Sequence, residues 1–315
     1  MTSRQLAALS GVGLVWGASF LFIRVLLNAG VAPFGVSAAR TAFGALAMLP
    51  FAFVLRRQFP RTRGTWLAMA LLGLTNFALP WTLFSFAGRL VPSGIGSITN
   101  SANPLLAALV AACLFKVDPL TKRQVGGLAL GFLGVVALLG EDLGNLGGSA
   151  PRAIALMLAA VTSYALSSAS IRRWFSQVPS VPLAFSQVTF AAIYLAPIAY
   201  FDGSFESARF GWQEWATLFA LGAGGSGIAV VWYMWLIRSV GPVRASLVTY
   251  LIPPVGVTLG WIVLGEPIGW NMLAGLVLIL GGLALVQGVS FRRGPKAEVA
   301  MSPIAPSASP EIGGR

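Results

Sequence analysis

Polar and aromatic side chains recur in the middle of long apolar stretches of this sequence, where burying an amide without a partner is costly. Asn76 and Asn103 are the most central amides, and we expect both to bind a solute. Amides and hydroxyls recognise solutes by hydrogen bonds, and aromatic rings recognise flat or apolar parts. The residues expected to line such a site are Trp16, Asn76, Trp81, Asn100, Asn103, Tyr164, Gln187, Ser226, Tyr233, Thr249 and Tyr250. The alternative is that these groups only bond one helix to another.

Three charged residues form a second group of candidates for charge pairing. Arg24 and Arg40 lie inside apolar stretches, and Glu266 lies at the end of one. A charge inside a membrane span indicates function by default, here the binding of a substrate carboxylate. Both arginines are also close enough to the outer surface to extend their guanidinium groups there. Pairing with Glu141, Asp142 or Glu266 is the structural alternative.

Several chemistries are excluded by the residues that are missing. The chain has no histidine and a single cysteine, Cys113, so it lacks His-dependent catalysis, His-ligated metal sites and an internal disulfide. The glycines of segment 222–227 fit a dinucleotide-binding pattern but lie within an apolar stretch and not in a βαβ unit. We therefore expect no enzyme activity, no cofactor and no metal.

The elements that position these residues are predicted from length and hydropathy. Of 315 residues, 57% are hydrophobic and only 10% are charged, whereas globular domains carry about 25% charged residues. Runs of about 20 apolar residues are long enough to cross a bilayer as a helix. The sequence thus predicts an all-α integral membrane protein with ten transmembrane helices, at 5–27, 33–55, 64–86, 92–115, 122–140, 152–171, 181–201, 212–236, 242–265 and 268–289.

The charges sort to opposite ends of these spans. Sixteen of the 21 Lys and Arg residues fall on the side of the N-terminus, and the opposite loops collect acids. Because basic loops stay in the cytosol, both termini are predicted to be cytosolic in a multi-pass protein of the cell (inner) membrane. The net charge of +12 is thereby explained without nucleic acid as a partner. Segment 291–315 is predicted to be a disordered cytosolic tail, because its Pro, Ser and Gly cannot bury a core.

The two halves of the chain repeat one another at a nearly constant offset. Asp118-Pro119 matches Glu266-Pro267, and Arg89 matches Arg238. We therefore predict two five-helix units, residues 1–144 and 145–290. An odd number of spans in each unit inverts the second unit relative to the first, as in many transporters.

Short motifs open and close these halves. They are Trp16-Gly17, Phe20, Arg24, Pro33 and Arg40 at the start, and Pro253, Leu264-Gly265-Glu266-Pro267, Gly275 and Gly282 at the end. Their order and spacing resemble the drug/metabolite transporter superfamily, and specifically two EamA-type modules. The first half departs from the pattern, with Lys116-Val117-Asp118 in place of Leu-Gly-Glu. The resemblance implies ten helices, cytosolic termini, and export or exchange of small metabolites such as amino acids.

Glycine and proline at matched midplane positions indicate where a solute binds. They are Pro80 and Asn103-Pro104 in the first half, and 222–227 and Pro253-Pro254 in the second. Weakened helices at a repeat interface are typical of transport sites. We expect an exporter of an amino acid, related compound or drug, working by alternating access; an intramembrane enzyme or a channel-like protein is the alternative. The expected partners are the solute and the lipid bilayer, and a homodimer stays open.

Overall fold

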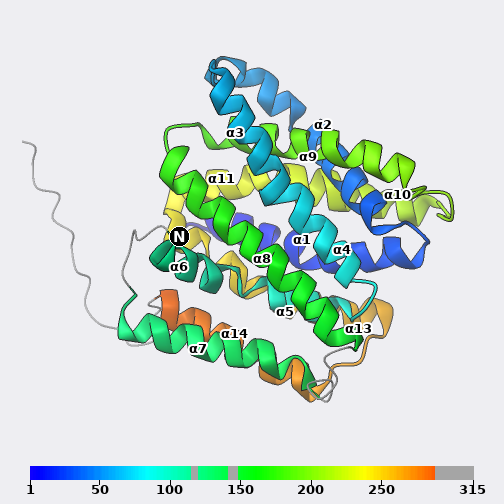
Figure 1. Ribbon diagram of the computed structural model, residues 1–315, viewed down its shortest axis with the longest axis vertical. Coiled ribbons are helices and arrows are strands. Elements are labelled where there is room, and N and C mark those ends of the chain that lie inside the picture. Colours follow the sequence, from blue (N-terminus) through cyan, green and yellow to red (C-terminus); the bar gives the residue numbers. More distant parts are fainter. Residues whose placement is uncertain (115–119, 141–147, 288–315) are drawn as a thin grey trace, which may run out of the picture.

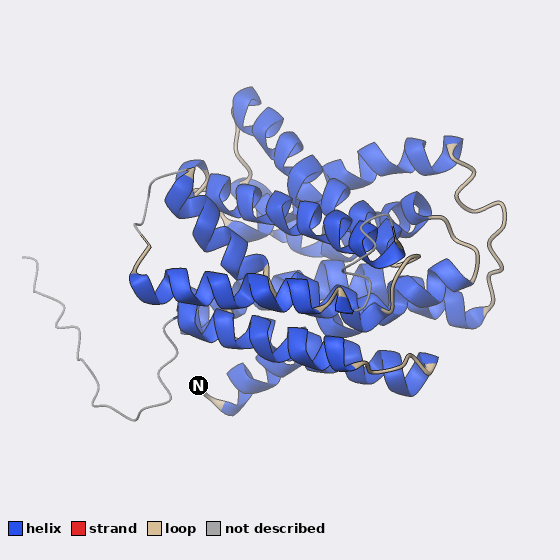
Figure 2. Cartoon of the chain, turned by 60° about the horizontal axis from the view of Figure 1, so that its bottom comes forward, coloured by secondary structure: helices blue, strands red, loops and turns tan. Residues whose placement is uncertain are grey.

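All regular secondary structure in the computed structural model is helical over the residues that it describes, which are 1–114, 120–140 and 148–287. The helices form one bundle in which segments far apart in the sequence lie side by side (Figure 1). No strand interrupts the described chain in the view coloured by secondary structure (Figure 2). The all-α prediction is therefore confirmed for these residues. The candidates Lys116, Asp118, Glu141 and Asp142 and the tail 291–315 lie outside them.

The helices of the N-terminal half follow one another at short spacing. They are α1 (Ser3–Asn28), α2 (Pro33–Val54), η1 (Arg56–Gln58), α3 (Arg63–Gly73), η2 (Leu74–Ala78), α4 (Leu79–Ala87), α5 (Ser93–Asn100), α6 (Asn103–Cys113) and α7 (Lys122–Ala137). Those of the C-terminal half are α8 (Ser149–Trp174), α9 (Ser180–Phe201), α10 (Trp212–Phe219), η4 (Ala220–Ile228), α11 (Ala229–Val240), α12 (Pro242–Ala245), α13 (Val248–Leu264) and α14 (Trp270–Gln287).

Eight helical stretches of the described chain are long and apolar enough to cross a membrane. They are Ser3–Asn28, Pro33–Val54, Arg63–Ala87, Ser93–Cys113, Ser149–Trp174, Ser180–Phe201, Trp212–Val240 and Trp270–Gln287, and each coincides with a predicted span. The other two predicted spans hold α13, with 17 residues, and α7, with 16. A 16-residue helix rises about 24 Å, less than the ~30 Å of a hydrocarbon core. A multi-pass membrane protein is thus indicated, while the count of ten stays a prediction.

Two of the predicted weak points are π-helical. The third span contains η2 and the eighth contains η4, where backbone N–H groups pair five residues back. In the third span the Leu79 N–H bonds the carbonyl of Leu74, five residues back, in place of the carbonyl four residues back that a regular α-helix would use. The next residue, Pro80, has no backbone N–H to donate. In the eighth, the Ser226 hydroxyl donates to the carbonyl of Leu221 at 3.2 Å. Such π segments are rare and often mark functional sites.

The other two predicted weak points differ from each other. The fourth span is interrupted between α5 and α6, so that Pro104 lies in the first turn of α6. The ninth span stays helical through Pro253-Pro254, and its interruption lies earlier, between α12 and α13. The expectation of a loosened helix is therefore wrong for Pro253-Pro254, which lie within α13. Pro253 frees the carbonyl of Thr249, and the hydroxyl of Ser101, which lies in the break between α5 and α6, donates to that oxygen at 3.4 Å.

Glycines set the closest helix contacts. α7 and α14 lie side by side (Figure 1) and run antiparallel, because Gly127 meets Gly282 while Gly134 meets Ile279. A methyl group on Gly127 would lie 2.7 Å from the Gly282 carbonyl oxygen. Likewise, a methyl group on Gly17 of α1 would lie 2.9 Å from the Ile252 carbonyl oxygen of α13. These glycines permit backbones to approach each other where side chains would not fit.

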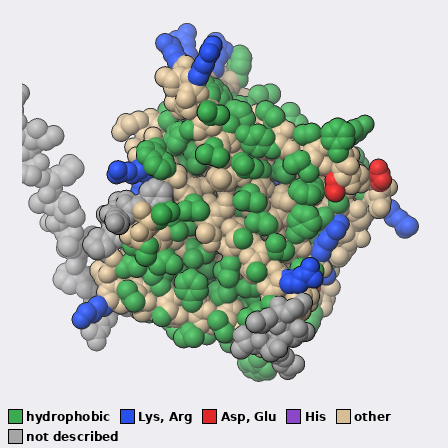
Figure 3. All heavy atoms as spheres, in the orientation of Figure 1, with side chains coloured by type: hydrophobic (Ala, Val, Ile, Leu, Met, Phe, Trp, Pro, Cys, Tyr) green, Lys and Arg blue, Asp and Glu red, His purple; other side chains and the backbone are tan. Residues whose placement is uncertain are grey.

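The surface agrees with a lipid environment. Hydrophobic side chains cover the middle of the face seen in Figure 3, and charged side chains lie around its rim. Exposed aromatic residues near helix ends include Trp212, Trp215 and Trp270, as expected for anchors at the membrane interface.

Candidate functional site

Arg40 of α2 lies at the centre of the candidate site. Its Nε donates a hydrogen bond to Ser226 Oγ at 2.8 Å, and its guanidinium carbon is 3.8 Å from the centroid of the Trp81 ring. Arg40 is only 9% exposed, and Ser226 is the central residue of the span Trp212–Val240. The guanidinium therefore points into the bundle at mid-depth. The alternative that it extends to the outer surface does not apply, because the cation–π contact and the hydroxyl hold it inside.

Tyr164 of α8 joins this group from the opposite half of the chain. It lies close enough to Arg40 for an electrostatic interaction. Its ring stacks on Phe84 of α4 with centroids 6.4 Å apart. Tyr164 is half-buried, whereas Phe84 and Trp81 are buried. We call Arg40, Trp81, Tyr164 and Ser226 the arginine cluster.

Trp16 of α1 lies against the same π segment as the arginine cluster. Its Nε1 donates to the Gly225 carbonyl at 2.9 Å, one residue from Ser226. Its ring packs on Tyr233 of α11, with centroids 5.0 Å apart and planes tilted by 58°. Both rings are half-buried. The π-helical backbone of η4 thus presents a carbonyl to α1 that a regular helix would keep within itself.

Asn76 and Gln187 meet at the other π segment. Asn76 Nδ2 donates to Gln187 Oε1 of α9 at 2.9 Å. The neighbouring Thr75 accepts the Ser163 hydroxyl at its backbone carbonyl and the Ser167 hydroxyl at its Oγ1, the latter at 2.8 Å. Asn76 therefore already has one helix-to-helix partner, while its second amide N–H and its side-chain oxygen have no hydrogen bond to the described residues.

The polar residues of the fourth and ninth spans have fewer partners. Asn103 Oδ1 and the Tyr250 hydroxyl are buried and have no hydrogen-bond partner among the residues that the structure describes. Asn100 and Thr249 are half-buried. An unsatisfied buried oxygen costs about 1–3 kcal/mol, so Asn103 Oδ1 and the Tyr250 hydroxyl are available to a ligand or water. The remaining predicted site residues thus form separate groups and do not all converge on one point.

Arg24 and Glu266 are bonded to other groups and not to each other. Arg24 Nη1 donates to the backbone carbonyl of Gly88. Both Glu266 carboxylate oxygens accept from the Ser93 backbone N–H, at 3.0 and 2.9 Å, and Oε2 also accepts the Ser93 hydroxyl at 2.6 Å. The considered pairing of Glu266 with Arg24 or Arg40 is replaced by this cap on α5. A carboxylate suits a helix N-terminus, where N–H groups are free.

Sequence reasoning missed Ser93, Thr75, Ser163 and Ser167. Ser93 follows Pro92 at the start of a span, which is a recognisable helix start. Its partner Glu266 is 173 residues away, however, and no local pattern connects them. Small hydroxyl residues of this kind are common in packed membrane helices.

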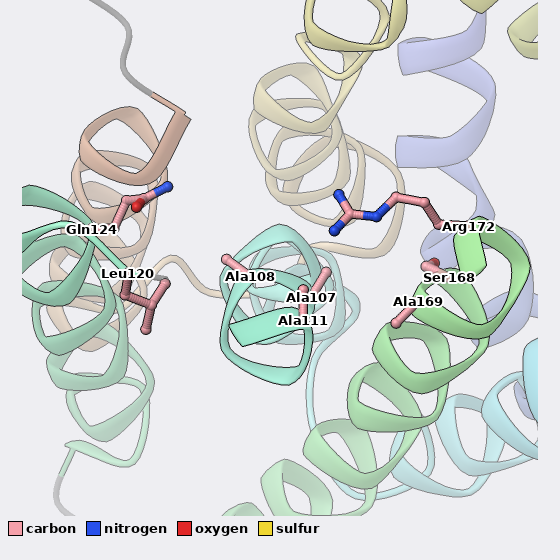
Figure 4. A pocket seen from close by; sticks show the side chains of 8 residues that line it. All are labelled: Ala107, Ala108, Ala111, Leu120, Gln124, Ser168, Ala169 and Arg172. Atoms are coloured by element: carbon pink, nitrogen blue, oxygen red, sulfur yellow. The ribbon is translucent and has the colours of Figure 1, made fainter. Parts of the chain in front are cut away.

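Two hollows of the described structure lie away from the predicted residues. One, of about 360 Å³, lies between α6, α7 and α8 and is lined by Ala107, Ala108, Ala111, Leu120, Gln124, Ser168, Ala169 and Arg172 (Figure 4). The other, of about 460 Å³, lies between α1 and α11 and is lined by Arg4, Ala7, Ala8, Val231, Trp232 and Trp235. Within the described ranges, no group of three metal-binding side chains occurs.

Comparisons with known proteins give one family model, several relatives and a related fold. The model of the EamA-like transporter family matches residues 5–140 and 151–287. The uncharacterized transporter YvbV of Bacillus subtilis strain 168 is 26% identical over 290 residues, covering 90% of this chain and 92% of YvbV. The uncharacterized inner membrane transporter YedA of Escherichia coli strain K12 is 28% identical over 291 residues, covering 91% and 92%. A crystal structure at 20% identity superposes with a TM-score of 0.61 over 90% of this chain and 96% of its own, which supports the fold.

Proposed function

The chain belongs to the EamA-like transporter family, and from this premise we propose that it carries a small metabolite across the cytoplasmic membrane. The solute is an amino acid, a related compound or a drug, and the direction is export. The carrier has ten spans in two inverted units, residues 1–144 and 145–290, with both termini in the cytosol. A site at mid-depth opens to one side and then to the other.

The helix packing supports the inverted repeat. α1, the first span of its unit, packs on α13 of the other unit, and α8, the equivalent first span, packs on α5 and α6. In the same way α2 packs on η4, and α9 packs on α3 and η2. Each contact thus has a counterpart with the two units exchanged, as a pseudo-two-fold axis requires.

The two π segments support a binding site at this axis. Shifting residues 74–78 of η2 by the repeat offset of 148 gives 222–226, which lies inside η4. Irregular helix at membrane depth is tolerated only where protein or a cavity satisfies the freed backbone groups. Its occurrence at equivalent places in both units favours a shared functional role over local accident.

The single observation that carries the proposal is the arginine cluster. It joins side chains of α2 and α4 from the first unit to side chains of α8 and η4 from the second, at mid-depth of the bundle. A group shared by both units changes its geometry when the units move against each other, which is what alternating access needs. Further polar and aromatic residues complete the proposed site. Trp16 and Tyr233 lie at η4, and the Asn76–Gln187 pair lies at η2.

Solute flux into proteoliposomes tests this function. Protein purified in detergent is reconstituted and loaded with unlabelled candidate solutes, and uptake of labelled solute is followed. Saturable counterflow of at least one solute, without chemical change, supports a carrier. Conversion of the solute would indicate an intramembrane enzyme, and flux that does not saturate would indicate a channel. Arg56 is an exposed arginine that lies over Phe53, so Arg56→Gln serves as the control for substitutions of the buried Arg40.

A further inference from the structure

Arg40 has more hydrogen-bond donors than its surroundings use. A guanidinium group carries five N–H donors. Nε donates to Ser226, and no other hydrogen bond from Arg40 reaches any residue that the structure describes. The four N–H groups on the two terminal nitrogens are therefore uncommitted. Two parallel N–H groups of this kind fit the two oxygens of a carboxylate.

No described acid balances the charge of Arg40. Of the four acidic residues in the described ranges, Glu266 bonds Ser93, Glu214 accepts the Gly211 N–H at 2.7 Å, and Asp202 accepts the Ser204 hydroxyl at 2.9 Å. The fourth, at position 206, lies in the loop after α9. An arginine at mid-depth is thus held by a ring face and a neutral hydroxyl alone. A buried charge without a counterion is costly, so a functional anion is the physical reason to keep it.

The surroundings of Arg40 are aromatic. The guanidinium lies over the ring of Trp81, and the Phe77 ring is perpendicular to the Trp81 ring with centroids 4.9 Å apart. Tyr164 and Trp16 are half-buried, so the described residues do not cover either side chain completely. Such walls accept a flat apolar body but offer no negative charge to an ammonium group.

We propose that Arg40 binds the carboxylate of an organic anion, whose flat apolar body lies against Tyr164 and Trp16. This inference rests on the proposed transport function and narrows its substrate class. A cationic drug is disfavoured, because the fixed charge of Arg40 repels it where the dielectric is low. An amino acid binds more weakly than the same carboxylate without its amino group, because no described acid at this depth pairs with the ammonium.

Four probes that share one ring test the charge preference. Phenylacetate, its neutral analogue phenylacetamide, the cation phenethylamine and phenyl phosphate are titrated into the purified full chain, and the midpoint of thermal unfolding is followed. Phenylacetate is expected to bind best. Arg40→Gln should weaken phenylacetate roughly ten- to a hundredfold, the loss expected for hydrogen bonds to a charged group. It should leave phenylacetamide unchanged, and Arg56→Gln should leave both unchanged.

Every other outcome overturns the proposal. Equal affinity for the acid and the amide, a preference for phenethylamine or for phenyl phosphate alone, or failure of phenylacetate and a wider panel of carboxylates to bind would each do so. Arg40→Lys adds a second readout, since it keeps the charge but loses the paired donors and should recover only part of the affinity. Flux of a cation in proteoliposomes would contradict the proposed anion site but not the proposed transport function. Anion binding without any flux would contradict the proposed transport function but not the anion site.

Discussion

The glycine contact between α7 and α14 gives a prediction whose magnitude can be worked from the structure. A methyl group added at Gly127 would lie 2.7 Å from the Gly282 carbonyl oxygen and 2.9 Å from Leu285 Cβ. Ordinary contacts between carbon atoms, such as this methyl and Leu285 Cβ, are about 3.5–4.0 Å, so the two helices must move apart by more than about half an ångström. Overpacking of this kind costs about 1–3 kcal/mol.

The neighbouring glycine is a matched control. A methyl group on Gly126 would meet nothing within 4 Å, and both glycines lie in the same helix. Replacing glycine by alanine inside a helix gains up to about 1 kcal/mol in helix propensity, whichever of the two is changed. The difference between Gly127→Ala and Gly126→Ala therefore isolates the clash. We expect Gly127→Ala to be less stable than Gly126→Ala by about 1–3 kcal/mol.

Unfolding in mixed micelles measures this difference. Each variant is titrated with a denaturing detergent while helix content is followed by circular dichroism, and refolding confirms that the transition is reversible. A Gly127→Ala protein as stable as Gly126→Ala would refute the close contact. Gly282→Ala is the reciprocal test, since its methyl would lie 2.5 Å from the Gly127 carbonyl oxygen and should show a loss of similar size.

Three further predictions follow from contacts described above. Asn76→Ala and Gln187→Ala remove the same hydrogen bond, worth about 0.5–1.5 kcal/mol, so each should lower the rate of solute flux by a factor of about 2 to 13. The double variant should lower it by no more than either alone, and additive losses would mean that the residues act independently. Glu266→Gln should destabilise the protein by about 1–3 kcal/mol, because the carboxylate loses its charge-assisted bonds to Ser93; no loss in detergent-induced unfolding would contradict the cap. A cysteine at the exposed Ser207 should react with an impermeant thiol reagent on intact cells while the native cysteine does not; the reverse labelling would invert the orientation.

The helices could be predicted from the sequence because a bilayer imposes both their length and their apolar character. The eight long spans coincide with the predicted ranges for this reason. The interruption in the ninth span could not be placed, because Pro253 weakens a helix only if no other group donates a hydrogen bond to the carbonyl that the proline frees. Here Ser101, from a span 148 residues earlier, bonds the freed carbonyl. That compensation depends on tertiary packing, which no local pattern contains.

The candidate site shows the same limit. Arg40 was recognisable as a charge inside an apolar span, but its direction was not, because an arginine side chain reaches either the surface or the interior from the same backbone position. The deciding groups, Trp81 and Ser226, come from two other spans. The Asn76–Gln187 bond is similar: each amide was predicted to be functional, and their pairing became visible only when η2 and α9 were placed together.

The packing of α1 on α13 also constrains how the chain is made. α1 ends at Asn28 and α13 begins at Val248, so about 220 residues are synthesised between them. At about 5–20 residues per second, the ribosome needs roughly 10–45 s to cover that distance. During this interval the face of α1 that carries Gly13 and Gly17 cannot yet pack against α13. The first helix therefore has to be stable in the bilayer alone, and it has the highest mean hydropathy of the eight long spans.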